Sequence, residues 1–170
     1  MTGRGHSVIG SELTGRVALV TDAGAGIGAV VAIAIAEAGA NLAICDRHLE
    51  RLADTSRAIE SIGRWCHAEL VDLSDDDAVA SWVTGAIAAL GPVEIVVGSS
   101  SVIRHVAPVM STGGSIVTVS PDAAPPAGLP TPFTQASVDR RLRTTCVAPD
   151  ADAATLVTWL ATDADGVSTP

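Results

Sequence analysis

Residues 21–28 form the part of this sequence best suited to binding a phosphate group. They read Thr-Asp-Ala-Gly-Ala-Gly-Ile-Gly and separate a short apolar run from a helical pattern. Glycines in such a turn let the backbone approach a pyrophosphate, which rests on the N-terminal amides of the following helix. A turn with a purely structural role would show the same glycines. The position between an expected strand and an expected helix favours phosphate binding.

An acidic residue follows the next apolar run. Asp46 lies 18 residues beyond Gly28, directly after the run 41–45. A carboxylate at this place can accept hydrogen bonds from the hydroxyls of an adenosine ribose, and it would repel a 2′-phosphate. Alternatively, Asp46 caps the helix expected after it. We interpret it as a ligand-recognition residue.

Few other side chains could carry chemistry. Arg104 and His105 could supply an acid, a base or an anion contact, but a surface histidine in a short loop is usually inert. His67 falls within an expected strand and is interpreted as structural. The acidic run 75–77 is interpreted as favourable charge at a helix N-terminus. No other metal-ligating residue is evident that would join this run, so no metal site is expected.

Alternating apolar runs and helical patterns must position these groups. Strands are expected at 16–21, 41–45, 66–71, 93–97, 115–119 and 143–147. Helices are expected at 29–38, 49–62, 75–90 and 152–161, with Ser74 or Asp75 capping the third. This alternation predicts a parallel sheet with right-handed crossovers. Residues 121–132 hold five of the nine prolines, which predicts a loop.

The composition argues against several partner classes. The net charge is −9 and every basic residue is Arg, so the chain should repel nucleic acid and anionic membranes. Three widely spaced cysteines argue against disulfides and zinc, and a reducing cytoplasm is expected. Residues 1–10 lack the apolar core of a signal peptide. No apolar run approaches the ~18 residues of a membrane helix.

From about Leu13 onward, the sequence resembles the short-chain dehydrogenase/reductase family. Residues 21–28 resemble the family motif TGxxxGxG with Asp22 at the first glycine, and Asp46-Arg47 resembles the end of the second strand in members that prefer NAD. Val71-Asp72-Leu73 is similar to the segment whose Asp contacts the adenine ring. Three later segments resemble the family's fifth strand, sixth strand and late helix, respectively at 113–120, 142–149 and 156–163. The resemblance implies a Rossmann-type α/β fold, a doubly wound parallel sheet with strand order 3-2-1-4-5-6.

The resemblance also implies a set of cofactor-binding residues. These are Asp22, Gly24, Gly26, Ile27, Gly28, Asp46, Arg47, Asp72, Leu73, Gly98 and Ser99. NAD(H) is expected to bind in preference to NADP(H) because of Asp46. Asp22 replaces the first motif glycine and adds negative charge near the phosphates. It should weaken cofactor affinity unless its side chain turns away to cap the helix.

The family's catalytic residues are not matched. Residues 98–101 read Gly-Ser-Ser-Ser in place of NNAG, so the Asn that assists a proton relay is lost. The YxxxK motif aligns with residues 133–137, Phe-Thr-Gln-Ala-Ser, and the chain contains neither Tyr nor Lys. The family's catalytic Ser falls at Ser120 or at Pro121, and a Ser at a strand end is usually a capping group. The sequence therefore offers no strong candidate for a catalytic residue, and Ser120 is a weak one.

The family's later elements are shortened here. Residues 101–113 are too few for a full crossover helix, residues 133–142 fit a turn or two, and the substrate loop and seventh strand are missing after Pro149. If each missing helix left on the order of 300 Å² of apolar surface exposed to water, the hydrophobic stabilisation lost would be roughly 7 kcal/mol per helix. We expect the exposed face of strands four to six to be covered by a partner, another copy of the chain, or a refolded 99–142 segment.

Together these observations predict an NAD(H)-binding protein of this family that lacks standard dehydrogenase catalysis. It would act as a binding or partner subunit, in a homo-oligomer or with a related subunit. One alternative is an active NAD-dependent oxidoreductase whose rearranged site uses Ser120, Ser99 or His105. Another is a truncated remnant without a retained role. The expected organisation is a flexible arm over residues 1–12 and one dinucleotide-binding domain over residues 13–170.

Overall fold

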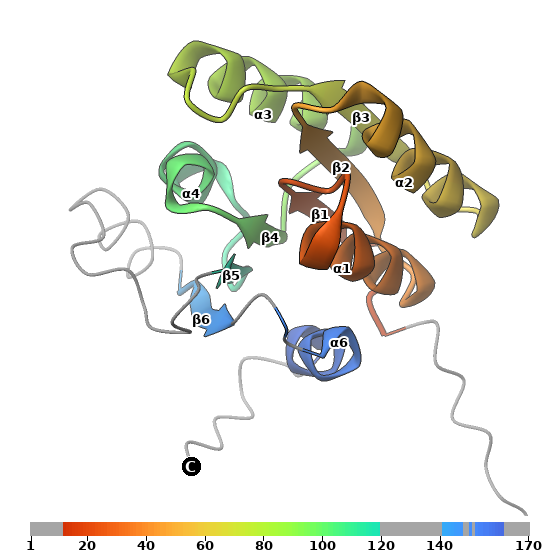
Figure 1. Cartoon of the computed structure of the whole chain (residues 1–170). Helices are drawn as coiled ribbons and strands as arrows, with labels where there is room; N and C mark the ends of the chain where they lie inside the picture. The colour runs from red at the N-terminus through yellow and green to blue at the C-terminus, as the bar shows by residue number, and fades with distance from the viewer. Residues whose placement is uncertain (1–11, 120–140, 148–149, 151, 162–170) are drawn as a thin grey trace, which may run out of the picture.

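Six strands and six helical segments make up the structure, a computed structural model that describes residues 12–119, 141–147, 150 and 152–161 (Figure 1). The strands are β1 (Val17–Val20), β2 (Asn41–Asp46), β3 (Cys66–Leu70), β4 (Ile95–Gly98), β5 (Ser115–Val119) and β6 (Arg143–Val147). The helices are α1 (Gly26–Glu37), α2 (Leu49–Ser61), α3 (Asp76–Leu90), α4 (Ser100–Val106), the 3₁₀ helix η1 (Ala107–Val109) and α6 (Ala153–Ala161).

All six strands join one parallel sheet in the order β3-β2-β1-β4-β5-β6, which confirms the predicted doubly wound topology. The central strands are apolar throughout because both faces of the sheet are covered. In β1, Ala18 and Val20 pack into one core while Val17 and Leu19 pack into the other.

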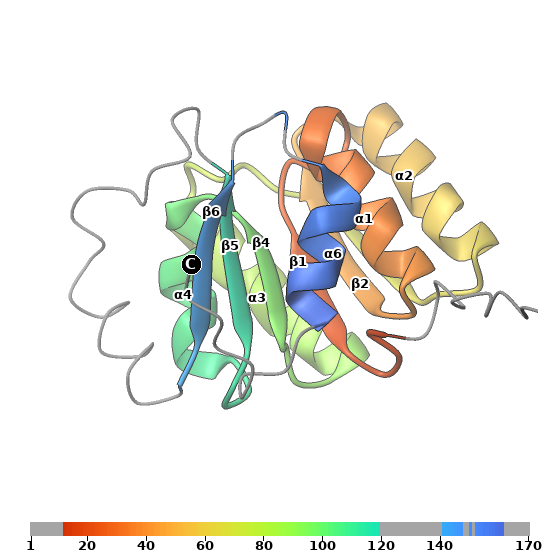
Figure 2. The ribbon, with the colours of Figure 1, turned by 90° about the horizontal axis from the view of Figure 1, so that it is seen from below.

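Helices cover the two faces of the sheet as separate layers. The two views show α1, α2 and α6 on one face, with α6 beside α1, and α3 and α4 on the other (Figure 2). Trp82 of α3 is the largest fully buried side chain, and it lies in the core under α3 and α4. This arrangement leaves the carboxyl ends of the strands as one common edge.

The chain itself covers the face of β4 and β5 that the shortened helices were expected to expose. Residues 100–109 form the 7-residue helix α4 and the 3-residue η1, which is shorter than a full crossover helix, as predicted. Val102, Ile103 and Met110 nevertheless pack against Val96 and Ile116, both of which are 0% exposed. Of the three covers considered, a refolded segment is therefore the one found over these two strands.

Most element boundaries fall within three residues of their expected positions. The helix α1 begins at Gly26 rather than at residue 29, because the last glycines of the turn already form its first residues. Strand β4 begins at Ile95 rather than at residue 93. Asp75 caps α3 by accepting hydrogen bonds from the amides of Asp77 and Ala78. Among the described helices, none is long and apolar enough to cross a membrane.

Several sequence-based expectations concern residues outside the described part of the chain. These are the N-terminal arm up to residue 11, the candidate Ser120, the Pro-rich residues 121–132 and the aligned motif at 133–137.

Candidate functional site

The strand order reverses between β1 and β4, and a hollow lies at the carboxyl ends of these two strands. Ligands of doubly wound sheets bind at such a switch point. We call it the β1–β4 hollow; it has a volume of about 150 Å³. Its lining residues are Thr21, Asp22, Ile27, Gly28, Val97, Gly98, Ser99 and Val119. A space of this size suits one part of a dinucleotide, since whole ligand pockets usually measure about 300–1,000 Å³.

The turn between β1 and α1 is held close to both neighbouring strands. The amide of Thr21 donates to the carbonyl of Val97 at 3.0 Å, and the amide of Ala23 donates to that of Cys45 at 3.1 Å. Asp22 has φ +51°, in the left-handed region that glycine adopts more easily. A Cβ at Gly28 would lie 2.3 Å from the carbonyl oxygen of Asp22, so only glycine fits there.

The N-terminus of α1 is open to an anion. Ala25 is the N-cap, no side chain caps the first amides, and the first turn contains no acidic residue. The free amides and the positive end of the helix dipole favour a negative group at this end. Asp22 therefore does not turn back to cap α1, one of the two roles considered for it from the sequence.

Asp46 connects the turn to the second helix. Its Oδ2 accepts a hydrogen bond from the amide of Gly24 at 2.9 Å, and its Oδ1 accepts one from the amide of His48 at 2.8 Å. A Cβ at Gly24 would lie 2.8 Å from Oδ2, which explains the glycine. His48 is the N-cap residue of α2, so Asp46 holds the turn that leads into α2 and does not itself cap that helix. Each carboxylate oxygen keeps a further lone pair for a ligand.

The turn is acidic, and this shifts the pKa of neighbouring groups. The pKa of Asp22 is raised, first by removal of water and then by the Asp46 carboxylate, while Arg47 acts in the opposite direction. Burial raises the pKa of the Cys45 thiol, and Asp22 and Asp46 raise it further. An anionic ligand entering the β1–β4 hollow therefore meets a negative side chain as well as the helix amides.

Two hydroxyl groups also line the hollow. Thr21 is 4% exposed, and its Oγ1 has no hydrogen-bond partner within the described part of the chain. A buried hydroxyl without a partner costs free energy, so a polar group of a ligand would stabilise it. The hydroxyls of Ser99 and Ser101 are 2.7 Å apart.

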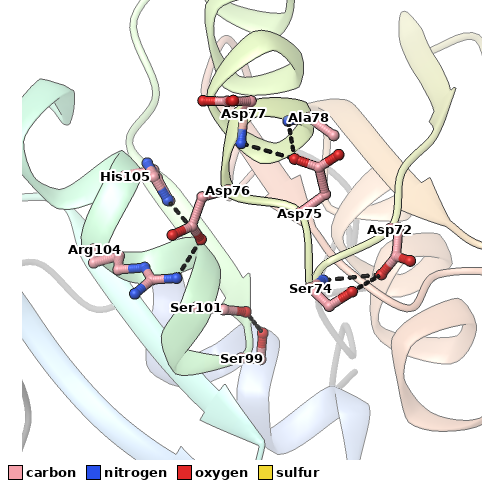
Figure 3. A network of polar contacts seen from close by, with 10 residues as sticks. All are labelled: Asp72, Ser74, Asp75, Asp76, Asp77, Ala78, Ser99, Ser101, Arg104 and His105. Atoms are coloured by element: carbon pink, nitrogen blue, oxygen red, sulfur yellow. Dashed lines mark hydrogen bonds and ion pairs between the residues drawn. The ribbon is translucent and has the colours of Figure 1, made fainter.

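Asp72 and Leu73 lie farther along the carboxyl edge, after β3. Asp72 is exposed, and its Oδ1 accepts hydrogen bonds from the amide and the hydroxyl of Ser74 at 2.9 and 2.7 Å (Figure 3). These bonds lower the pKa of Asp72. Leu73 is half-buried against the α3 side of the sheet. The Asp72 carboxylate thus shapes a local turn in this structure.

A cluster that the sequence did not predict joins α3 to α4. The Asp76 carboxylate pairs with Arg104 and lies 3.4 Å from Nε2 of His105 (Figure 3). The sequence had placed Arg104 and His105 in a surface loop; they lie in helix α4 instead. Because Asp76 is 28 and 29 positions away from them, no local pattern could have indicated the contact.

Five predicted residues therefore line one hollow: Asp22, Ile27, Gly28, Gly98 and Ser99. The lining residues that the prediction missed are Thr21, Val97 and Val119. Gly24, Gly26, Asp46, Arg47, Asp72 and Leu73 do not line it, although Asp46 and Gly24 support its turn. Among the described residues, no group of three His, Cys, Asp or Glu side chains could hold a metal ion.

The comparisons with known proteins agree with this geometry. A family model described as "short chain dehydrogenase" matches residues 16–112. The chain belongs to the short-chain dehydrogenase family. An uncharacterized oxidoreductase of Mycobacterium tuberculosis, MT0954, is 34% identical over 88 residues, which cover 52% of this chain and 34% of that protein. The chain thus spans about a third of the length of this curated relative.

Solved short-chain dehydrogenases share the fold over most of the chain. A metagenomic short-chain oxidoreductase, solved in complex with NADP, is 27% identical with a TM-score of 0.72, covering 92% of this chain and 95% of that one. Carveol dehydrogenase from Mycobacterium avium, solved in complex with NAD, has a TM-score of 0.72 at 21% identity, covering 81% of this chain and 71% of that one. The second likeness concerns the fold alone.

Proposed function

We propose that this short-chain dehydrogenase binds NAD(H) and lacks the family's standard proton-transfer chemistry. The β1–β4 hollow carries the binding proposal, because open helix amides and the buried Thr21 hydroxyl face the same small space. The pyrophosphate would rest on the N-terminus of α1, and the adenosine would extend toward Asp46. When bound, the nicotinamide ring supplies hydride transfer, while the protein supplies orientation.

The absence of Tyr and Lys from the 170 residues supports the catalytic part of the proposal. The resemblance assigns proton transfer to that Tyr and the lowering of its pKa to that Lys. We therefore expect no turnover of simple carbonyl substrates with NADH. Turnover would favour a rearranged oxidoreductase site. Ser99 is its first candidate because it lines the hollow, and Ser99→Ala should then remove the activity.

The choice between NAD(H) and NADP(H) depends on two adjacent side chains. The Asp46 carboxylate would repel a 2′-phosphate, whereas the exposed Arg47 guanidinium would attract one. Because the metagenomic relative was solved in complex with NADP, both cofactors have to be considered for this chain. We propose that Asp46 prevails, because two backbone amides hold its carboxylate in place.

Calorimetric titration with NADH and NADPH tests this proposal. We expect NADH to bind more tightly, and Asp46→Ala to narrow the ratio of the two dissociation constants. Asp46→Ala also removes the hydrogen bond to the Gly24 amide, which should weaken the binding of both ligands alike. For this reason the ratio of the two dissociation constants is compared, and not either constant alone. Asp54→Ala, at an exposed position on α2, is the control and should leave the ratio unchanged. Equal affinities in the unmodified protein would contradict the preference.

We also propose that the protein serves as a partner subunit, as a homo-oligomer or with a related chain. Measuring the mass of the same sample in solution tests the homo-oligomer. A monomer that stays monomeric with NADH bound would leave only the related chain as partner.

A further inference from the structure

The β1–β4 hollow holds a negative side chain where the proposed ligand carries its own negative charge. Asp22 lines the hollow next to Gly28, at the open N-terminus of α1. Its backbone is fixed, since the amides on both sides of it are bonded to Val97 and Cys45. A pyrophosphate resting on the free N-terminal amides of α1 would therefore come close to the Asp22 carboxylate.

The groups around Asp22 do not neutralise it. Asp46 faces it from the end of β2 and is held there by the amides of Gly24 and His48. Arg47 is the cation that acts on Asp22, and its exposed position means that solvent screens its effect. The Thr21 hydroxyl acts in the same direction as Arg47 and lowers the pKa of Asp22, and the buried Cys45 thiol completes the surroundings. Removal of water is the largest cause of the raised pKa of Asp22 and the Asp46 carboxylate is the next, although the Asp22 side chain keeps contact with solvent.

We propose that Asp22 is a specificity-determining residue that makes the β1–β4 hollow bind a dinucleotide pyrophosphate together with a proton. This inference rests on the proposed NAD(H) binding. A nearby anion favours the neutral form of a carboxyl group, so the bound pyrophosphate and a protonated Asp22 stabilise one another. The ligand class that suits this hollow is therefore a phosphate ester whose affinity rises as the pH falls.

The sign of the pH dependence follows directly. As the pH rises through the pKa of Asp22, the carboxylate becomes charged and repels the phosphates, so the dissociation constant increases. For an exposed carboxylate near an anion, we expect NAD⁺ to bind roughly three- to tenfold more weakly at about pH 8 than at about pH 5. Because the same process takes up a proton, the apparent binding enthalpy should depend on the ionisation enthalpy of the buffer.

Three variants identify the titrating group. Asp22→Asn keeps the shape of the side chain and tolerates the positive φ, and it should bind NAD⁺ with equal affinity at both pH values and without proton uptake. Asp22→Gly, which suits this φ best, should behave in the same way and guards against misfolding of the first variant. Asp54→Asn removes an exposed carboxylate on α2 and should retain the full pH dependence.

Titration of the four proteins with NAD⁺ at both pH values, in two buffers, decides the matter. Loss of pH dependence and proton uptake in both Asp22 variants, with retention in Asp54→Asn, supports the proposal. If the unmodified protein binds equally at both pH values, or if the Asp22 variants keep the dependence, the proposal fails while NAD(H) binding stands. If none of the four proteins binds NAD⁺ at either pH, the proposed function fails as well.

Discussion

Gly28 is the residue on which the shape of the turn between β1 and α1 most directly depends. A methyl group there would lie 2.3 Å from the carbonyl oxygen of Asp22, which is backbone and cannot move aside cheaply. We expect Gly28→Ala to lower the free energy of unfolding by about 1–3 kcal/mol or more and to abolish NADH binding. Urea unfolding and calorimetry measure the two effects.

Gly85, in the interior of α3, provides the matched control. A Cβ there would meet only Nε2 of His67, at an ordinary 3.6 Å. Gly85→Ala should therefore raise the free energy of unfolding by about 0.5–1 kcal/mol, through the better helix propensity of alanine. If both substitutions had the same sign and size, the close approach at Gly28 would not be what constrains the turn.

At this scale, the sequence predicted the turn but not its partners. Glycine spacing is a local signal, so residues 21–28 could be placed between strand and helix from sequence. The bond from Gly24 to Asp46 could not, because it depends on how two strands end side by side. The same holds for Asp76, whose partners come from a helix packed beside its own.

Arg143 fastens α6 to the sheet, together with Arg16, which donates to the Leu160 carbonyl oxygen at 3.2 Å. Arg143 starts β6 and donates to the carbonyl oxygens of Trp159 and Leu160 at 3.3 Å and to the hydroxyl of Ser115 at 2.7 Å. Its guanidinium also lies 4.7 Å from the centre of the Trp159 ring. We expect Arg143→Ala to lower the free energy of unfolding by about 1.5–3 kcal/mol and to accelerate amide hydrogen exchange in α6.

Two further substitutions separate charge from geometry at this contact. Arg143→Lys keeps the charge but loses the planar fork, so it should recover only part of the stability. Arg57→Ala removes an exposed pair with Asp54 on α2 and should stay within about 0.5 kcal/mol of the unmodified protein. Unchanged exchange of α6 amides in Arg143→Ala would contradict the proposed attachment.

Among the elements, the strands were the easiest to predict and α4 the hardest. Strands such as β1 and β4 are continuous apolar runs, the signal expected of strands covered on both faces in a parallel sheet. Residues 100–106 read Ser-Ser-Val-Ile-Arg-His-Val, two turns at most, which is too short to show a helical period. The helix forms because Val102, Ile103 and Val106 pack against the sheet, a tertiary effect invisible in the local sequence.

For the molecule as a whole, the alternation of elements predicted a parallel sheet with right-handed crossovers, while the strand order followed from the family resemblance. The cover of β4 and β5 was not predictable in the same way. Three different covers satisfied the need to bury that face, and only packing distinguishes them. The finding that α4 covers both strands also removes part of the reason for expecting a partner there.

The two cores share every central strand, so they should unfold together. Trp82 belongs to the α3 side, while Trp159 lies on α6 across the sheet. In a Trp65→Phe background, where Trp159 is the remaining indole, Trp82→Ala should lower the free energy of unfolding by about 3–5 kcal/mol, and the fluorescence of Trp159 should report the same shifted transition as far-UV circular dichroism.

Trp82→Phe is the companion variant for this test. The Trp82 Nε1 is buried without a hydrogen-bond partner in the described part of the chain, so replacing the indole by a phenyl ring leaves no donor unsatisfied. It should cost clearly less than Trp82→Ala. Coincident transitions in both variants would mark one cooperative unit and argue against a decayed remnant. If Trp82→Ala instead left the Trp159 transition in place, the two layers would be independent, and the shared strands would not couple them.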